Sequence, residues 1–181
     1  MSILNIVEHK SSSYSPRTYN NASVADITVA IAVDHNTAGE RCTQNAVAAA
    51  KKQIVKLEMS EDYLNMARAV WRAVKDIPEP TINIAGNGIY TLQKQGWTQE
   101  KVNRIVYDIL AKVHEHHPIK KIVSGGQTGV DLAGGVAAYK LGIDCELTLP
   151  KGFIMRFQNG KDYEHLEEFV RKLVVDYAGK L

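Results

Sequence analysis

Apolar, β-branched segments alternate with longer helical segments along most of this chain. The run ADITVAIAV is followed by an alanine-rich stretch, and TINIAG and KKIVS are each followed by apolar residues at helical spacing. Strands that alternate with helices of this length are parallel and joined by crossover connections. We therefore predict an α/β fold, a three-layer Rossmann-like sandwich with a mostly parallel sheet. The four predicted strands end near Val33, Gly86, Ser124 and Pro150.

Capping residues and apolar periodicity predict the helices. Thr37 followed by Glu40 is a capping-box signature and predicts a helix over 38–57, and Thr98 predicts one over 98–116. Further helices are predicted over 60–74 (with Ser60 as N-cap), 129–142 and 161–179, and the segment NGIYTLQKQGW is predicted to be a loop.

The N-terminal segment has too little apolar content for a core of its own. Residues 10–23, KSSSYSPRTYNNAS, are rich in Ser, Asn and Tyr, so we predict an extended arm (1–23) before a single domain (24–181). Tyr and Arg are favoured where protein surfaces meet. Together with the apolar faces of the helices 38–57 and 98–116, this predicts a homo-oligomer in which Arg17 or Tyr19 comes near a partner's pocket. The alternative is a flexible tail on a monomer.

Charge and cysteine content narrow the function classes. The chain has 22 Lys and Arg against 20 Asp and Glu, a net charge of +2, which gives no support to a nucleic-acid partner. No run of about 18 apolar residues predicts a membrane span, and the N-terminus lacks the basic start of a secretory signal. Cys42 and Cys145 are far apart and in no metal spacing. We expect a soluble, cytoplasmic protein without a metal site.

In a parallel sheet, ligands bind beyond the carboxyl ends of the strands. Four unusual loops follow the predicted strands: DHNTAGE, AGNGIYT, SGGQTGVD and PKGFIMRFQNGKD. In SGGQTGVD, glycines allow backbone amides to approach a ligand, and the following helix directs its N-terminus at the same place. Ser124 and Thr128 add hydroxyl groups, and Gln127 and Thr128 have no evident structural need in a tight turn. The expected guest is a phosphate or another oxyanion; the alternative is an ordinary tight turn.

The remaining loop residues offer contacts to a sugar or a base. Asn87 can present a donor and an acceptor, and Tyr90 can stack on a ring. Asp131 either contacts a ligand hydroxyl or only complements the helix dipole. The predicted ligand-binding residues are Asp34, Thr37, Arg41, Gly86, Asn87, Gly88, Tyr90, Ser124, Gly125, Gly126, Gln127, Thr128, Gly129, Asp131, Lys151 and Arg156.

The segment from Ser124 to Asp131, followed by an alanine-rich helix, LGID and PKG, resembles a known family. It is similar to the molybdenum-cofactor carrier proteins of the SLOG superfamily of Rossmann-like domains, over Ile122 to Gly152. The resemblance implies a pocket for a nucleotide or a nucleotide derivative. Phosphoribohydrolases of the same superfamily carry P-G-G-x-G-T-x-x-E, whereas this chain has Leu132 in place of the catalytic glutamate.

Three functions follow from these observations. The leading hypothesis is binding of a small nucleotide-derived phosphate, such as an ADP-ribose-type or cyclic nucleotide signal, without turnover. The second is an enzyme that cleaves an N-glycosidic bond of a nucleoside phosphate, with Asp131, Glu40 or Asp34 as the acid; Asp131 is the candidate catalytic residue. The third is carriage of molybdopterin. No cofactor other than such a bound nucleotide or molybdopterin is expected.

Overall fold

The computed structural model describes residues 3–181. Its centre is a six-stranded sheet in which every strand pairs in parallel with its neighbours, in the order β1-β6-β5-β4-β2-β3. The strands are β1 (Leu4–Glu8), β2 (Ile27–Ala32), β3 (Gln53–Glu58), β4 (Thr81–Gly86), β5 (Lys121–Ser124) and β6 (Asp144–Leu149). The predicted parallel α/β architecture is therefore confirmed.

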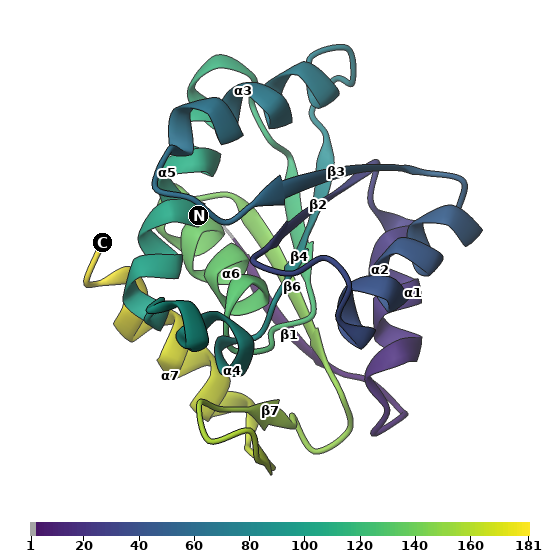
Figure 1. Ribbon diagram of the computed structural model, residues 1–181, viewed down its shortest axis with the longest axis vertical. Coiled ribbons are helices and arrows are strands. Elements are labelled where there is room, and N and C mark those ends of the chain that lie inside the picture. The colour runs from purple at the N-terminus through teal and green to yellow at the C-terminus, as the bar shows by residue number, and fades with distance from the viewer. Residues whose placement is uncertain (1–2) are drawn as a thin grey trace.

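Helices cover both faces of the sheet and make the fold a three-layer sandwich. Figure 1 shows α1 and α2 on one side, and α3, α5, α6 and α7 on the other. The helices are α1 (Tyr14–Val24), α2 (Ala38–Ala49), α3 (Tyr63–Val74), α4 (Ile89–Leu92), α5 (Gln99–His116), α6 (Val130–Leu141) and α7 (Glu167–Ala178). A short ribbon, β7 (Met155–Arg156) with β8 (Asp162–Tyr163), lies between β6 and α7.

The core forms where the sequence is most continuously apolar. All six residues of β2 are buried, as expected for a central strand of a parallel sheet covered on both faces. Helix α6 packs closely on the sheet because Gly134 lies against Ile84; a methyl group on Gly134 would come within 2.8 Å of the Ile84 Cβ. This close contact places the N-terminus of α6 directly beyond β4 and β5.

Two strands of the sheet were not predicted. The segment 38–57 is not one helix: α2 ends at Ala49, Lys51 adopts a left-handed φ of 55°, and β3 follows on the sheet edge. β1 occupies the opposite edge. Both strands are only partly buried, so neither shows the continuous apolar run that identified the central strands.

The prediction of an extended N-terminal arm is wrong. Residues 4–8 form β1, and residues 14–24 form helix α1, which packs against α2 on the same molecule. Its inner face is made by Arg17, Asn21 and Ala22. This face is mostly polar, and for that reason hydrophobic periodicity did not reveal the helix.

Smaller differences concern element ends. The segment after β4 contains α4 and a 3-10 turn (Gln93–Gln95) where a loop was predicted. Helix α3 begins at Tyr63 with Asp62 as its N-cap, and the Ser60 hydroxyl accepts a hydrogen bond from the Asp62 amide instead. The last helix begins at Glu167, after the ribbon. Within residues 3–181, no helix is both long enough and apolar enough to cross a membrane.

Candidate functional site

From β2 the chain continues outward to β3, and from β4 it continues in the opposite direction to β5. The strand order therefore reverses at the crevice between β2 and β4. Ligands bind at this point in open parallel sheets. Asn87 fills it: its Oδ1 accepts hydrogen bonds from the amides of Val33 (2.9 Å) and Asp34 (3.1 Å). Its Nδ2 donates to the Asp34 carbonyl at 3.1 Å, and the residue is 3% exposed. Asn87 therefore ties two loops together, a use that competes with the expected contact to a base.

The polar side chains of the SGGQTGVD loop also bond within the protein. The Gln127 amide donates to the Ile154 carbonyl and accepts from the Arg156 amide, at 2.6 and 2.9 Å. The Thr128 hydroxyl donates to the Arg156 carbonyl. The buried Ser124 hydroxyl lies 2.7 Å from the Ile84 carbonyl oxygen. Gln127 and Thr128 thus have a structural role, contrary to expectation: they attach the segment after β6 to the loop.

The start of α6 is held from a second side by α5. The Gly129 amide donates to Gln99 Oε1 at 2.6 Å, and Gln99 Nε2 donates to the Gly129 carbonyl at 2.9 Å. Asn103 fixes the Gln99 side chain through a 2.8 Å hydrogen bond. Gly88 forms a bridge with Gly129. Gly86 has no room for a side chain beside Val130. The loop is therefore rigidly placed.

Gly125 and Gly126 form the turn of this loop and are both buried, and Arg17 covers Gly125. Their backbone amides and that of Thr128 donate to no acceptor within residues 3–181. A methyl group on Gly125 would overlap the Arg17 guanidinium, so α1 places a buried cation directly on the loop. Arg17 is 5% exposed, and its Nη1 lies 3.5 Å from Asp131 Oδ2. Free amides beside a cation are an arrangement suited to an anion.

Glu40 and His35 extend this cluster beneath α2. Glu40 is 2% exposed, and its Oε2 lies 3.6 Å from His35 Nδ1. Within the described chain, Arg17 Nε, His35 Nδ1 and Glu40 Oε2 are buried without a hydrogen-bond partner. Buried polar atoms are nearly always paired in folded proteins, so this group of unpaired atoms marks a candidate site. We call Arg17, His35, Glu40 and Asp131 the buried charged cluster.

The pKa values of the two acids of the cluster, Glu40 and Asp131, are both raised. The pKa of Glu40 is raised to about 8, mainly by burial and then by the neighbouring Asp131 charge, with Lys56 acting in the opposite direction. Burial raises the pKa of Asp131 to about 6, against the lowering effects of Arg17 and of the backbone amides of Gly86 and Gln127. At neutral pH, Glu40 therefore holds a proton while Asp131 is ionised. Acids whose pKa values are pushed apart in this way are typical of acid–base sites.

The other predicted residues surround the cluster without joining it. Asp34 is exposed and its carboxylate accepts from the Asn36 amide at 2.7 Å, so it is no buried acid. Thr37 accepts from the Glu40 amide at 3.2 Å, which confirms the predicted cap. Arg41 bonds the Asn36 carbonyl at 2.5 Å.

The segment after β6 contributes a rim of side chains. Arg156 pairs with Asp162 at 2.8 Å, and the Tyr14 hydroxyl donates to the same carboxylate at 3.0 Å. Lys151 is exposed. Tyr90 is 41% exposed but lies against Gly160, with Lys94 Nζ 4.4 Å from its ring centroid. These contacts leave less of the Tyr90 ring free to stack on a base.

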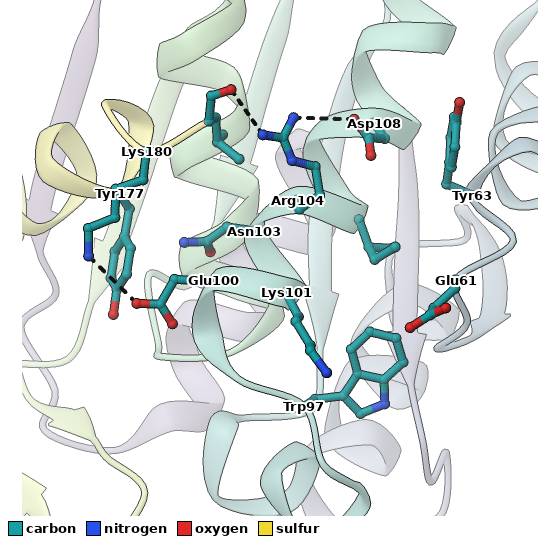
Figure 2. A pocket seen from close by; sticks show the side chains of 12 residues that line it. Glu61, Tyr63, Trp97, Glu100, Lys101, Asn103, Arg104, Asp108, Tyr177 and Lys180 are labelled. Carbon is teal, nitrogen blue, oxygen red and sulfur yellow. Dashed lines mark hydrogen bonds and ion pairs between the residues drawn. The ribbon is translucent and has the colours of Figure 1, made fainter.

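Two surface pockets lie elsewhere, on the side of α5. The larger, of about 530 Å³, is bordered by Trp97 and Tyr63 on one side of α5 and by Tyr177 and Lys180 on the other. Figure 2 shows Lys180 paired with Glu100, at 3.6 Å, and Arg104 paired with Asp108, at 3.8 Å. No predicted site residue lines either pocket. The buried charged cluster is instead covered by α1.

Arg17 and His35 were not among the predicted site residues. Arg17 was expected to approach a partner's pocket, but it reaches the loop of its own chain. His35 follows Asp34 in the sequence, but neighbours at a strand end point apart, and the partner of His35 is Glu40. An arginine and a histidine on separate elements leave no spacing signal in the sequence.

No protein-family model matches this chain, and none of the curated proteins compared with it is significantly similar. Among residues 3–181, no group of three or more His, Cys, Asp or Glu side chains is placed to hold a metal ion. The function must therefore be inferred from the buried charged cluster and the loops around it.

Proposed function

We propose that this protein binds a small nucleotide-derived phosphate at the carboxyl edge of its sheet, as a sensor, carrier or sequestering protein. The observation that carries the proposal is Arg17, buried over the free amides of Gly125 and Gly126 with an unpaired Nε. A cation and backbone amides that converge at a strand–helix turn form a subsite for a phosphate oxygen. The resemblance to SLOG domains supports the nucleotide class.

Titration calorimetry with ADP-ribose, AMP and a cyclic dinucleotide tests this proposal. A charge-assisted hydrogen bond is worth about 1.5–3 kcal/mol, so Arg17→Met should weaken binding at least tenfold. Arg72→Met, which removes an exposed arginine on α3, is the control and should bind as the wild type does. Equal affinity of the wild type and Arg17→Met would contradict the proposal. Native mass spectrometry of freshly purified protein would identify a co-purifying ligand, molybdopterin included.

A second function, cleavage of an N-glycosidic bond, is favoured by the acid pair. A protonated, buried Glu40 can donate a proton to a departing base, and ionised Asp131 can stabilise the positive charge that develops on the sugar or orient a water. Two carboxyl groups with separate protonation states are the requirement of such a reaction.

Chromatography of nucleoside monophosphates, NAD and ADP-ribose after incubation with the protein separates the two functions. A binding protein returns each compound intact. Steady release of free base, abolished by Asp131→Asn and by Glu40→Gln, would establish the enzyme and reject binding without turnover.

We further propose that the chain forms a homo-oligomer through α3 and α5. Leu64 and Trp71 are 43% and 40% exposed and border a groove of about 420 Å³ with Val113. Exposed apolar side chains that lie together mark interaction surfaces. The arm no longer contributes to this proposal, because α1 packs on its own domain.

A further inference from the structure

We propose that ligand binding moves the Arg17 guanidinium from Asp131 to the anionic group of the ligand. The two carboxyl groups that it leaves behind, Asp131 and Glu40, then take up one proton from solvent. The proposal rests on the function proposed above, since it requires an anionic ligand at this edge of the sheet. It makes Arg17, which lies outside every recognised motif, the residue that selects for an anion.

The position of Arg17 makes the exchange necessary. Its guanidinium occupies the space above Gly125, so a ligand that reaches the free amides of Gly125 and Gly126 meets Arg17 first. The guanidinium is not fully used: Nε has no partner, and the bond from Nη1 to Asp131 is long, at 3.5 Å. A phosphate offers several acceptors in the geometry that a guanidinium prefers. Arg17 therefore gains better partners by turning from Asp131 to the ligand.

The surroundings of Asp131 contain more acids than cations. The groups that face the two acids are Arg17 from α1, Asp34 and His35 after β2, Glu40 from α2, Lys56 from β3, and the backbone amides of Gly86 and Gln127. Of the lysines and arginines in residues 3–181, only Arg17 lies within ion-pair distance of Asp131 or Glu40. Arg17 is thus the one cation in direct contact with Asp131 among the described residues, and Glu40 has no lysine or arginine within ion-pair distance.

When Arg17 moves away from Asp131, the number of protons held by Asp131 and Glu40 changes. Arg17 is the largest of the influences that lower the pKa of Asp131, which burial raises to about 6. Without that influence the pKa of Asp131 rises, since an ionised carboxylate would remain buried beside Glu40. At pH 7 Asp131 is mostly ionised before binding, so its carboxylate gains a proton as the ligand takes Arg17.

The affinity for the ligand should be higher at lower pH, because the liganded protein holds more protons than the free protein. Uptake of one proton makes the association constant fall about tenfold for each pH unit above the pKa of free Asp131, up to the raised pKa of the bound state. An ion pair that stayed intact would leave the affinity almost independent of pH in this range.

Proton uptake can be counted by titration calorimetry with ADP-ribose at pH 7, in PIPES and in Tris. These buffers differ in ionisation enthalpy, and the diphosphate of ADP-ribose does not titrate near neutral pH. We expect the wild type to take up close to one proton, roughly one per ligand bound. Asp131→Asn should bind with little or no uptake. Asp108→Asn, which removes an acid on α5 whose pKa burial also raises, is the control and should keep the wild-type value.

The outcomes separate this inference from the proposed function. Binding of ADP-ribose without proton uptake would overturn the exchange and leave the binding function in place. Absence of binding by ADP-ribose, AMP and the cyclic dinucleotide would contradict the binding function and the inference with it. Carboxyl NMR gives a ligand-free check: Arg17→Gln should raise the pKa of Asp131, and Arg156→Gln should not. An unchanged pKa in Arg17→Gln would also overturn the exchange.

Discussion

Arg17 lies over Gly125 with its charge against Asp131, and at the scale of single residues this contact organises the site. Two further residues, Gly126 and Glu40, affect the shape of the SGGQTGVD loop and the charge beneath it. Gly126 turns the backbone, and Glu40 holds a proton beneath the loop. Both can be tested without knowledge of the ligand.

Gly126 adopts a φ of 70°, and a methyl group there would lie 2.7 Å from Leu149 Cδ1. Both the left-handed backbone and the contact disfavour a side chain, so Gly126→Ala should lower the free energy of unfolding by about 1–3 kcal/mol. Gly39→Ala is the control: Gly39 is in a helix with open space around it, and alanine should stabilise by about 0.5–1 kcal/mol. Urea denaturation measures both. Equal effects of the two substitutions would show that the loop is not constrained as described.

Glu40 should make stability depend on pH. The pKa of Glu40 is about 8 in the folded protein, well above the ordinary glutamate value of 4.5, so the folded state binds the proton more tightly than the unfolded state. The free energy of unfolding should therefore fall as pH rises from 5 to 8, as this contribution is lost. Glu40→Gln should be more stable than the wild type at pH 8, with the difference shrinking toward pH 5.

Glu168→Gln, on an exposed position of α7, is the control for Glu40→Gln. Urea denaturation at pH 5.5, 7 and 8.5 compares the three proteins. If Glu40→Gln followed the wild type in parallel across this range, Glu40 would not be a buried acid with a raised pKa.

At the scale of elements, α5 and α6 are joined at their first residues through Gln99 and Gly129. This contact sets the direction in which α6 leaves the loop. Gly134 then keeps α6 close to β4. The site is thus positioned by the packing of two helices and a sheet.

Gln99→Leu should weaken the contact between α5 and the start of α6. The substitution leaves the buried Gly129 amide unpaired, at about 1–3 kcal/mol, whereas the Gly129 carbonyl keeps its hydrogen bond from the Ala133 amide at 3.1 Å. Thermal or urea unfolding should show this loss, whereas Gln95→Leu, at an exposed position, should change stability by less than about 0.5 kcal/mol. Unchanged stability of Gln99→Leu would mean that water or another residue replaces the contact.

At the scale of the whole molecule, the two faces of the sheet differ in use. The face with α1 and α2 covers the buried charged cluster, and the face with α3 and α5 carries the exposed Leu64 and Trp71 (Figure 1). Ligand binding and assembly are therefore expected on opposite sides of the sheet. Neither should depend directly on the other.

The oligomer should be a dimer or larger that Trp71→Glu dissociates, because a charge at a self-associating apolar surface is costly to bury. Light scattering at micromolar concentration measures the mass. Tyr139→Glu, with a similar exposure of 38% on α6, is the control and should leave the mass unchanged. A monomeric wild type would reject this prediction.

The sequence by itself determined the parallel α/β fold and the edge at which to search for a site. Central strands such as β2 are buried on both faces and therefore continuously apolar, and caps such as Thr37 and Thr98 act within one turn; both signals are local. The edge strands β1 and β3 and the polar inner face of α1 carry no such local signal.

Only the tertiary structure decided which polar residues meet. Gln127 and Asn87 bond backbone groups 27 and 54 residues away, and Arg17 reaches Asp131 across 114 residues. A side chain's partner depends on how the crossover helices place distant segments, and the pattern around each residue does not encode it. Burial of Glu40 and Asp131, and with it their raised pKa values, follows from the same packing and from nothing local to either residue.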